Sequence, residues 1–137
     1  MRSVSNRAQQ RGQIRTLLGR LCRFHLWEPN RFGINKALPF NEAILEHGQG
    51  NIRRAYTYKA LNKLIQGSAA DMTKKSMLEL YKEGIIAHIQ IHDELDISVE
   101  SDKKAKRIIE IMEAAVDLEV PNKVDYESGK TWGDIYD

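Results

Sequence analysis

At residue 85 the spacing of apolar residues changes. Apolar residues occupy every second position over residues 85–91, and after a polar break the alternation resumes over residues 95–99. Alternation places the apolar side chains on one face of a β-strand. Two such runs around a short polar break predict a β-hairpin. The apolar face of that hairpin has to be covered, so the remainder of the chain is expected to supply helices.

The first fifty residues are predicted to hold one helix, two short strands and a long loop. Residues 1–12 have the pattern of the end of a helix, with Gly12 as its stop. Residues 13–24 predict two strands around Gly19. Residues 27–50 are rich in glycine and proline and predict mostly loop.

Two helices are predicted before the hairpin. Residues 51–63 contain no helix breaker and are expected to be helical. Gly67 is expected to interrupt, and Ser68 can cap a second helix that ends at Gly84.

After the hairpin, one more helix and one more strand are expected. Ser101 or Asp102 can cap a helix, because apolar residues then recur at helical spacing through residue 116. Residues 123–126 are predicted to form a last strand, followed by a turn at Gly129 and an anchoring Trp132. This order favours an α+β fold, in which an antiparallel sheet is covered by helices.

Charge is distributed unevenly along the 137 residues. The net charge is +2, but residues 1–82 hold 15 Lys and Arg against 5 Asp and Glu, which is a net +10, and residues 83–137 hold 6 against 14, which is a net −8. A basic half indicates an anionic partner, most commonly a phosphate backbone. A solvated basic surface, a self-complementary pair of halves and a site for divalent cations remain alternatives.

Two acids follow each other at the predicted hairpin turn, Asp93 and Glu94. Carboxylates at a rigid turn are well placed to hold Mg²⁺, which prefers oxygen ligands. An ordinary acidic turn is the alternative, because Asp is common in turns. His88 and His92 do not form a shared metal site, because residues four apart in a strand are about 13 Å apart.

A second polar pair, Asn62 and Gln66, lies one helical turn apart. If the helix extends that far, both amides are on one face. Amide donors can reach minor-groove acceptors, which look alike in all base pairs. A capping segment with surface amides is the alternative. Gly67 and the alanines after it would allow close packing.

Four stretches occur in a particular order. Residues 12–20 read GQIRTLLGR, residues 60–71 read ALNKLIQGSAAD, residues 90–95 read QIHDEL and residues 128–132 read SGKTW. In this order they resemble the C-terminal part of family A DNA polymerases, which include bacterial DNA polymerase I and many phage replicative enzymes. The corresponding family patterns are G-x-x-x-T-L-x-G-R, N-x-x-x-Q-G-[ST]-A-A-D, the V-H-D-E of motif C, and G-x-x-W.

The resemblance implies part of a polymerase domain used in DNA replication. Residues 1–84 would form the fingers-to-palm connection with its helices. Residues 85–137 would form the palm hairpin with motif C, a helix and a terminal strand.

The resemblance also implies roles for individual residues. Asp93 would bind the catalytic metals together with an aspartate of motif A, and Glu94 would have a weaker metal role. His92 would contact the primer near its 3′ end. Asn62 and Gln66 would contact the minor groove near the new base pair.

Four cationic side chains are expected to contact DNA. The family often has arginine four residues before the asparagine, where this chain has Tyr58, although Lys59 is adjacent. The expected cations are Arg20, Arg53, Arg54 and Lys59.

The implied cofactor is a pair of Mg²⁺ ions, and the implied partners are primer–template DNA and deoxynucleoside triphosphates. The motif A strand and the motif B helix, which grips the triphosphate, do not occur in residues 1–137. The chain is therefore expected to be inactive alone and to need an N-terminal polymerase polypeptide.

Two other hypotheses remain open. A non-catalytic DNA-binding module or remnant would have the same basic half. An unrelated metal-dependent nuclease would need more acids near Asp93, and Asp96 is expected to face away from the strand neighbours of Glu94.

The sequence has no apolar run long enough for a membrane span, and its single cysteine, Cys22, excludes a disulfide scaffold. Both features fit a cytoplasmic protein.

Overall fold

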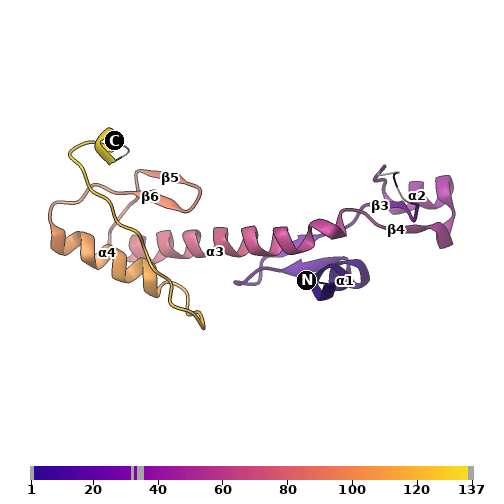
Figure 1. Cartoon of the computed structure of the whole chain (residues 1–137), viewed down its shortest axis with the longest axis horizontal. Coiled ribbons are helices and arrows are strands. Elements are labelled where there is room, and N and C mark those ends of the chain that lie inside the picture. The colour runs from indigo at the N-terminus through magenta and orange to yellow at the C-terminus, as the bar shows by residue number, and fades with distance from the viewer. Residues whose placement is uncertain (1, 32, 34–35, 136–137) are drawn as a thin grey trace. The chain divides into compact units, whose positions relative to one another are not determined.

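The computed structural model describes residues 2–31, 33 and 36–135. It divides into two compact units, residues 1–68 and 69–137. The described residues combine helices with three two-stranded antiparallel sheets, which confirms the predicted α+β class (Figure 1). Each unit has its own apolar core, and the two are described in turn.

The first unit opens with the predicted helix and pair of strands, α1(Arg2–Arg11), β1(Gln13–Arg15) and β2(Leu21–Arg23). The helix ends at Gly12, whose φ of 68° lies in the left-handed region that favours glycine. The two strands are antiparallel, with Ile14 opposite Cys22. Ile14 and Phe24 form the core of this unit together with two buried alanines, Ala8 and Ala60.

The region predicted to be loop contains regular structure, β3(Trp27–Pro29), α2(Phe40–His47) and η1(Gln49–Asn51). Pro39 is the N-cap residue of α2, and Gly48 is its C-cap residue with a φ of 82°. The loop prediction was wrong here because proline and glycine flank a short helix instead of marking a continuous loop.

The predicted helix over residues 51–63 was also wrong in its first part. Residues 52–54 form β4(Ile52–Arg54), which pairs antiparallel with β3 and places Arg53 opposite Glu28. Tyr56 then has a left-handed φ of 61°, and the chain turns through η2(Thr57–Lys59) into the next helix. Pairing with a strand distant in sequence thus overrides a segment free of helix breakers.

The helix α3(Ala60–Lys82) runs through Gly67 without a break, so the predicted interruption and the Ser68 cap were wrong. Its predicted end is confirmed. The Ile85 amide donates to the Leu80 carbonyl at 3.0 Å, and Gly84 has a φ of 75°. A glycine followed by this bond forms a Schellman C-cap, and Leu80 and Ile85 also pack together in a core.

The second unit holds the predicted hairpin and helix, β5(Ile89–Ile91), β6(Glu94–Asp96) and α4(Asp102–Ala114) (Figure 1). The strands are shorter than the alternation suggested. Ser101 caps α4, because its side chain accepts a hydrogen bond from the Lys104 amide at 3.3 Å. In the core of the second unit, the end of α3 packs against α4 through Leu80, Ile85, Ile108 and Ile111.

The predicted strand over residues 123–126 was wrong, because this segment pairs with no described strand. A side chain of α4 holds it instead. Glu113 accepts from the Val124 amide at 3.1 Å and from Lys123 Nζ at 3.3 Å. The last described element is η3(Trp132–Ile135), where Trp132 is half exposed.

Among the described residues, the helices are too short or too polar to cross a membrane.

The Glu113 contact should make the C-terminal segment sensitive to acid. The hydrogen bond from the Val124 amide, assisted by Lys123, lowers the pKa of Glu113. A lowered folded-state pKa contributes stability above the unfolded value of about 4.3, and this stability is lost as the pH falls through the folded value. Hydrogen-exchange protection of the Val124 amide should therefore be present at pH 7 and lost in acid.

Glu113→Ala should lower that protection several-fold at pH 7 and remove its pH dependence. Glu119→Ala, which removes an exposed acid beyond α4, is the matched control and should leave the protection unchanged. Equal protection in Glu113→Ala and the unaltered chain would contradict this account of the segment.

Candidate functional site

The hairpin turn of the second unit is fixed by its register. Ile91 lies opposite Glu94, so the loop between the strands consists of His92 and Asp93. His92 has a φ of 50°, and two-residue hairpin loops need a left-handed residue at this first position. Gln90 Nε2 donates to the His92 carbonyl at 2.6 Å and braces the loop from within the hairpin.

The expected catalytic acids are both exposed at this turn. Asp93 is the second loop residue and Glu94 is the first residue of β6. Both line a hollow of about 1000 Å³ that also involves α4 and the C-terminal segment. Because Asp93 is exposed and lies in a fixed loop, its carboxylate is available to a ligand in solution.

These two residues fit part of a magnesium shell but not all of it. Mg²⁺ commonly takes one or two carboxylates and completes its shell with water and phosphate oxygens. Within the described ranges, His, Cys, Asp and Glu side chains form no group of three or more that could hold a metal. Asp93 and Glu94 therefore offer two donors, and further oxygen ligands must come from elsewhere.

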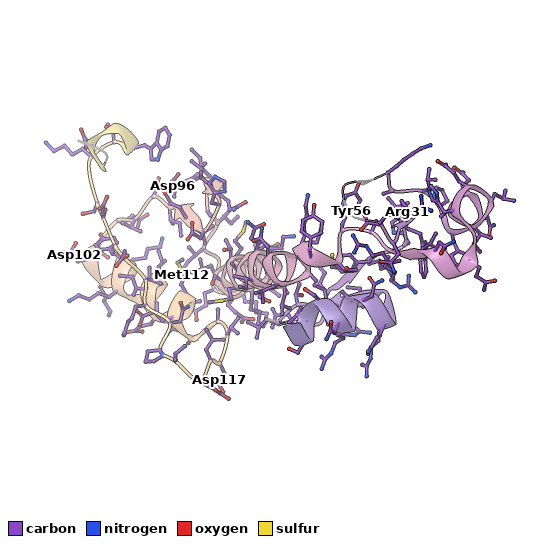
Figure 2. All side chains as sticks on the ribbon, turned by 45° about the vertical axis from the view of Figure 1, so that its right-hand side comes forward. Arg31, Tyr56, Asp96, Asp102, Met112 and Asp117 are labelled. Atoms are coloured by element: carbon purple, nitrogen blue, oxygen red, sulfur yellow. The ribbon has the colours of Figure 1, made fainter. Side chains whose placement is uncertain are left out.

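A third carboxylate, Asp96, lies two residues along β6 (Figure 2). Burial raises the pKa of the Asp96 carboxyl, and hydrogen bonding with Glu94 together with the negative charge of Glu94 raises this pKa further. Asp96 and Glu94 therefore interact on one side of the strand, as residues i and i+2 must.

In the first unit, α3 places Asn62 and Gln66 one turn apart, as predicted, and both residues are exposed. In the part of the chain that the structure describes, neither side-chain amide has a hydrogen-bond partner. Lys59 lies just before the helix, with Nζ 5.5 Å from the centre of the Tyr56 ring and 5.6 Å from that of Tyr58. This end of α3 thus presents two amides and an aromatic-flanked cation to solvent.

The two arginines of β4 have partners within the fold. Arg53 Nε donates to the buried Glu28 carboxylate at 2.9 Å. Arg54 donates to the Gln9 carbonyl at 3.2 Å and to the Phe24 carbonyl at 3.0 Å, and its guanidinium lies 4.5 Å from the centre of the Trp27 ring. Both arginines lie on a strand and not on the helix turns before Asn62 that the sequence suggested. Their contact with DNA stays a prediction.

The loop between β1 and β2 contacts α3 beside Gln66. Arg20 Nη2 donates to the Gly67 carbonyl at 2.7 Å, and the Leu17 amide donates to Ser68 Oγ at 3.0 Å. Sequence reasoning predicted close packing at Gly67 but missed Thr16 and Leu17 as its neighbours. The feature that could have revealed them is a glycine inside a helical segment, where close packing can offset the low helix propensity of glycine.

Comparisons with known proteins identify the family to which this chain belongs. The model of the family described as DNA polymerase family A matches residues 1–134. A DNA-directed DNA polymerase of Pseudomonas phage M6 is 39% identical over 127 residues, which cover 93% of this chain and 16% of that protein. A DNA polymerase I of Bacillus caldotenax is 34% identical over 143 aligned residues, covering 98% of this chain and 14% of that protein.

Solved structures agree with the sequence comparisons. The POL domain of Pol1 from M. smegmatis, in complex with DNA primer-template and dNTP, superposes with a TM-score of 0.64 at 28% identity, covering 96% of this chain and 22% of that one. The fold thus corresponds to part of a DNA polymerase domain. This chain belongs to the family A DNA polymerases, and it spans about a sixth or less of the length of the two curated relatives described above.

Arg54 should be required for the stability of the first unit. Arg54→Ala removes two hydrogen bonds from a charged donor, so the free energy of unfolding should fall by about 2–4 kcal/mol. Lys63→Ala, at an exposed position of α3, should change it by less than about 0.5 kcal/mol. Chemical denaturation of both variants measures the difference, and equal stabilities would show that Arg54 is not a structural residue.

Proposed function

We propose that this chain supplies Asp93 as a metal ligand for template-dependent transfer of nucleotides to a primer 3′ end. The observation that carries the proposal is the position of Asp93, exposed in a two-residue loop that register and a Gln90 brace hold in place. Membership of the family supports this reaction, and the loop geometry supports a role for this carboxylate in it.

Asp93 would hold Mg²⁺ through its carboxylate, and Glu94 would contribute a second, weaker donor. A pair of such ions activates the primer hydroxyl and stabilises the leaving oxygen in this type of reaction. The hairpin itself keeps the carboxylate in one place, which matters because metal-assisted catalysis requires fixed ligands. His92, the neighbouring loop residue, would lie against the primer end.

The amides at the start of α3 would contact the DNA minor groove. Asn62 and Gln66 are exposed on one helix, and their donors suit purine N3 and pyrimidine O2, which occur in every base pair. Lys59 and Arg20 would add phosphate contacts. These contacts would position the primer–template without selecting a sequence.

The second catalytic aspartate and the cations that bind the triphosphate would come from polymerase sequence outside residues 1–137. The sequence that carries these residues can belong to the same polypeptide or to a separate one, because catalysis depends on the assembled geometry. Deoxynucleoside triphosphates would bind where both parts meet.

Primer extension tests this function. The chain is combined with the remainder of a family A polymerase domain, joined in one polypeptide or added separately, and synthesis is measured with Mg²⁺. Asp93→Asn should reduce the rate at least about a hundredfold, because a metal clamp contributes several kcal/mol and about 1.36 kcal/mol corresponds to tenfold.

Asp117→Asn is the matched control, since it makes the same change at an exposed residue on the loop after α4 (Figure 2). Its rate should equal that of the unaltered chain. Full activity of Asp93→Asn would refute the metal role. Salt-sensitive binding to primed template without synthesis in any combination would instead favour a non-catalytic DNA-binding module.

A further inference from the structure

Gly67 lies within a long helix, where glycine is about 1 kcal/mol less favourable than alanine. Thr16, in the loop between β1 and β2, is in close contact with it. A Cβ atom added to Gly67 would lie 2.7 Å from Thr16 Cγ2 and 3.5 Å from Arg20 Nη2. Thr16 is buried, so its methyl group has little room to move. The absence of a side chain at residue 67 is therefore what allows the loop to reach the helix backbone.

Two hydrogen bonds hold the loop at the same turn of α3. Arg20 donates to the Gly67 carbonyl at 2.7 Å. Ser68 Oγ accepts from the Leu17 amide at 3.0 Å and donates to the Leu64 carbonyl at 2.7 Å. The Ser68 hydroxyl thus donates its proton to a carbonyl of its own helix and accepts a hydrogen bond from the loop.

The loop is itself a closed turn. The Gly19 amide donates to the Thr16 carbonyl at 2.9 Å, and the Thr16 amide donates to the Arg20 carbonyl at 2.9 Å. Gly19 has a φ of 87°, and Arg15 Nη1 caps its carbonyl at 2.8 Å. These hydrogen bonds restrict the conformation of the turn, so the turn can set the position of the helix that it contacts.

We propose that the loop of residues 16–20 is a positioning device that sets the location of Gln66 and Asn62 against the primer–template minor groove. Gln66 directly precedes Gly67, and Asn62 lies one turn earlier on the same exposed side. Fixing the helix backbone at residues 67 and 68 fixes its rotation and its shift along the axis, and thus both amides. The inference rests on the proposed function, because it assigns these amides to DNA.

Gly67→Ala tests the device. The added methyl group must separate the loop from the helix by several tenths of an ångström or more, since 2.7 Å is shorter than carbon atoms tolerate. A misplacement of about 1 Å can cost about a hundredfold in rate, so primer extension by the assembled polymerase domain should fall about 10–100-fold. Gly50→Ala is the matched control, because a Cβ there meets nothing within 4 Å, and it should extend primers normally.

A second primer separates positioning from a general loss of structure. In this primer, 3-deazaguanine replaces the terminal guanine, so the minor-groove N3 acceptor is missing. The assembled polymerase domain with the unaltered chain should extend it about tenfold more slowly than the normal primer. Gly67→Ala should extend both primers at similar rates, because the contact is already lost.

Thr16→Ser combined with Gly67→Ala should restore both the rate and the sensitivity to the N3 acceptor. Serine lacks the Cγ2 atom that collides and keeps the hydroxyl. If Gly67→Ala slows both primers but keeps the full tenfold difference, or leaves the rate unchanged, the positioning role is overturned.

If the proposed function is wrong, the primers give a result that differs from the result expected when only the positioning role is wrong. If the unaltered chain, Asn62→Ala and Gln66→Ala all extend the two primers alike, the minor-groove role of the amides is wrong, and the positioning role falls with it. Asn62→Ala or Gln66→Ala could instead abolish the rate difference between the two primers while Gly67→Ala keeps it in full. That result overturns the role of the loop and leaves the minor-groove role of the amides intact.

Discussion

The pairing of Ile91 with Glu94 is the interaction on which the acidic site depends. Because these residues are opposite each other, His92 and Asp93 alone reverse the chain. A shift of register by one residue would turn every side chain of the hairpin to its other face and would move Asp93 into a strand. The left-handed φ of His92 and the Gln90 bond to its carbonyl are consequences of this tight loop. A strained residue beside an exposed acid is typical of functional turns.

In the first unit, contacts between residues distant in sequence hold the helices in place. Arg54 joins α1, the end of β2 and Trp27, and the loop after β1 grips α3 at Gly67 and Ser68. These contacts use charged and backbone hydrogen bonds beside a small apolar core of four buried residues, two of which are alanines. Arg53 and Arg54 of this unit thus serve the fold, whereas Lys59, Asn62 and Gln66 are exposed to solvent.

What the sequence predicted correctly was local in origin. The hairpin followed from alternation around a polar break, and the end of α3 followed from Gly84. The errors came from contacts between separate segments. Residues 52–54 pair with β3, and Thr16 packs where a side chain at residue 67 would lie. Glu113 binds the segment that was expected to be a strand. Asp93 and Glu94 remain candidates that were proposed from their neighbours in sequence, whereas the hydrogen bonding between Glu94 and Asp96 is seen only in the structure.

The central claim is that the carboxylate of Asp93 is a ligand of the catalytic metal. An experimental structure of the polymerase domain containing this chain, with primer–template, deoxynucleoside triphosphate and Mg²⁺ bound, measures this directly. The account predicts a carboxylate oxygen of Asp93 at about 2.1 Å from a magnesium ion. A complete magnesium site with Asp93 turned away from the metal would contradict it.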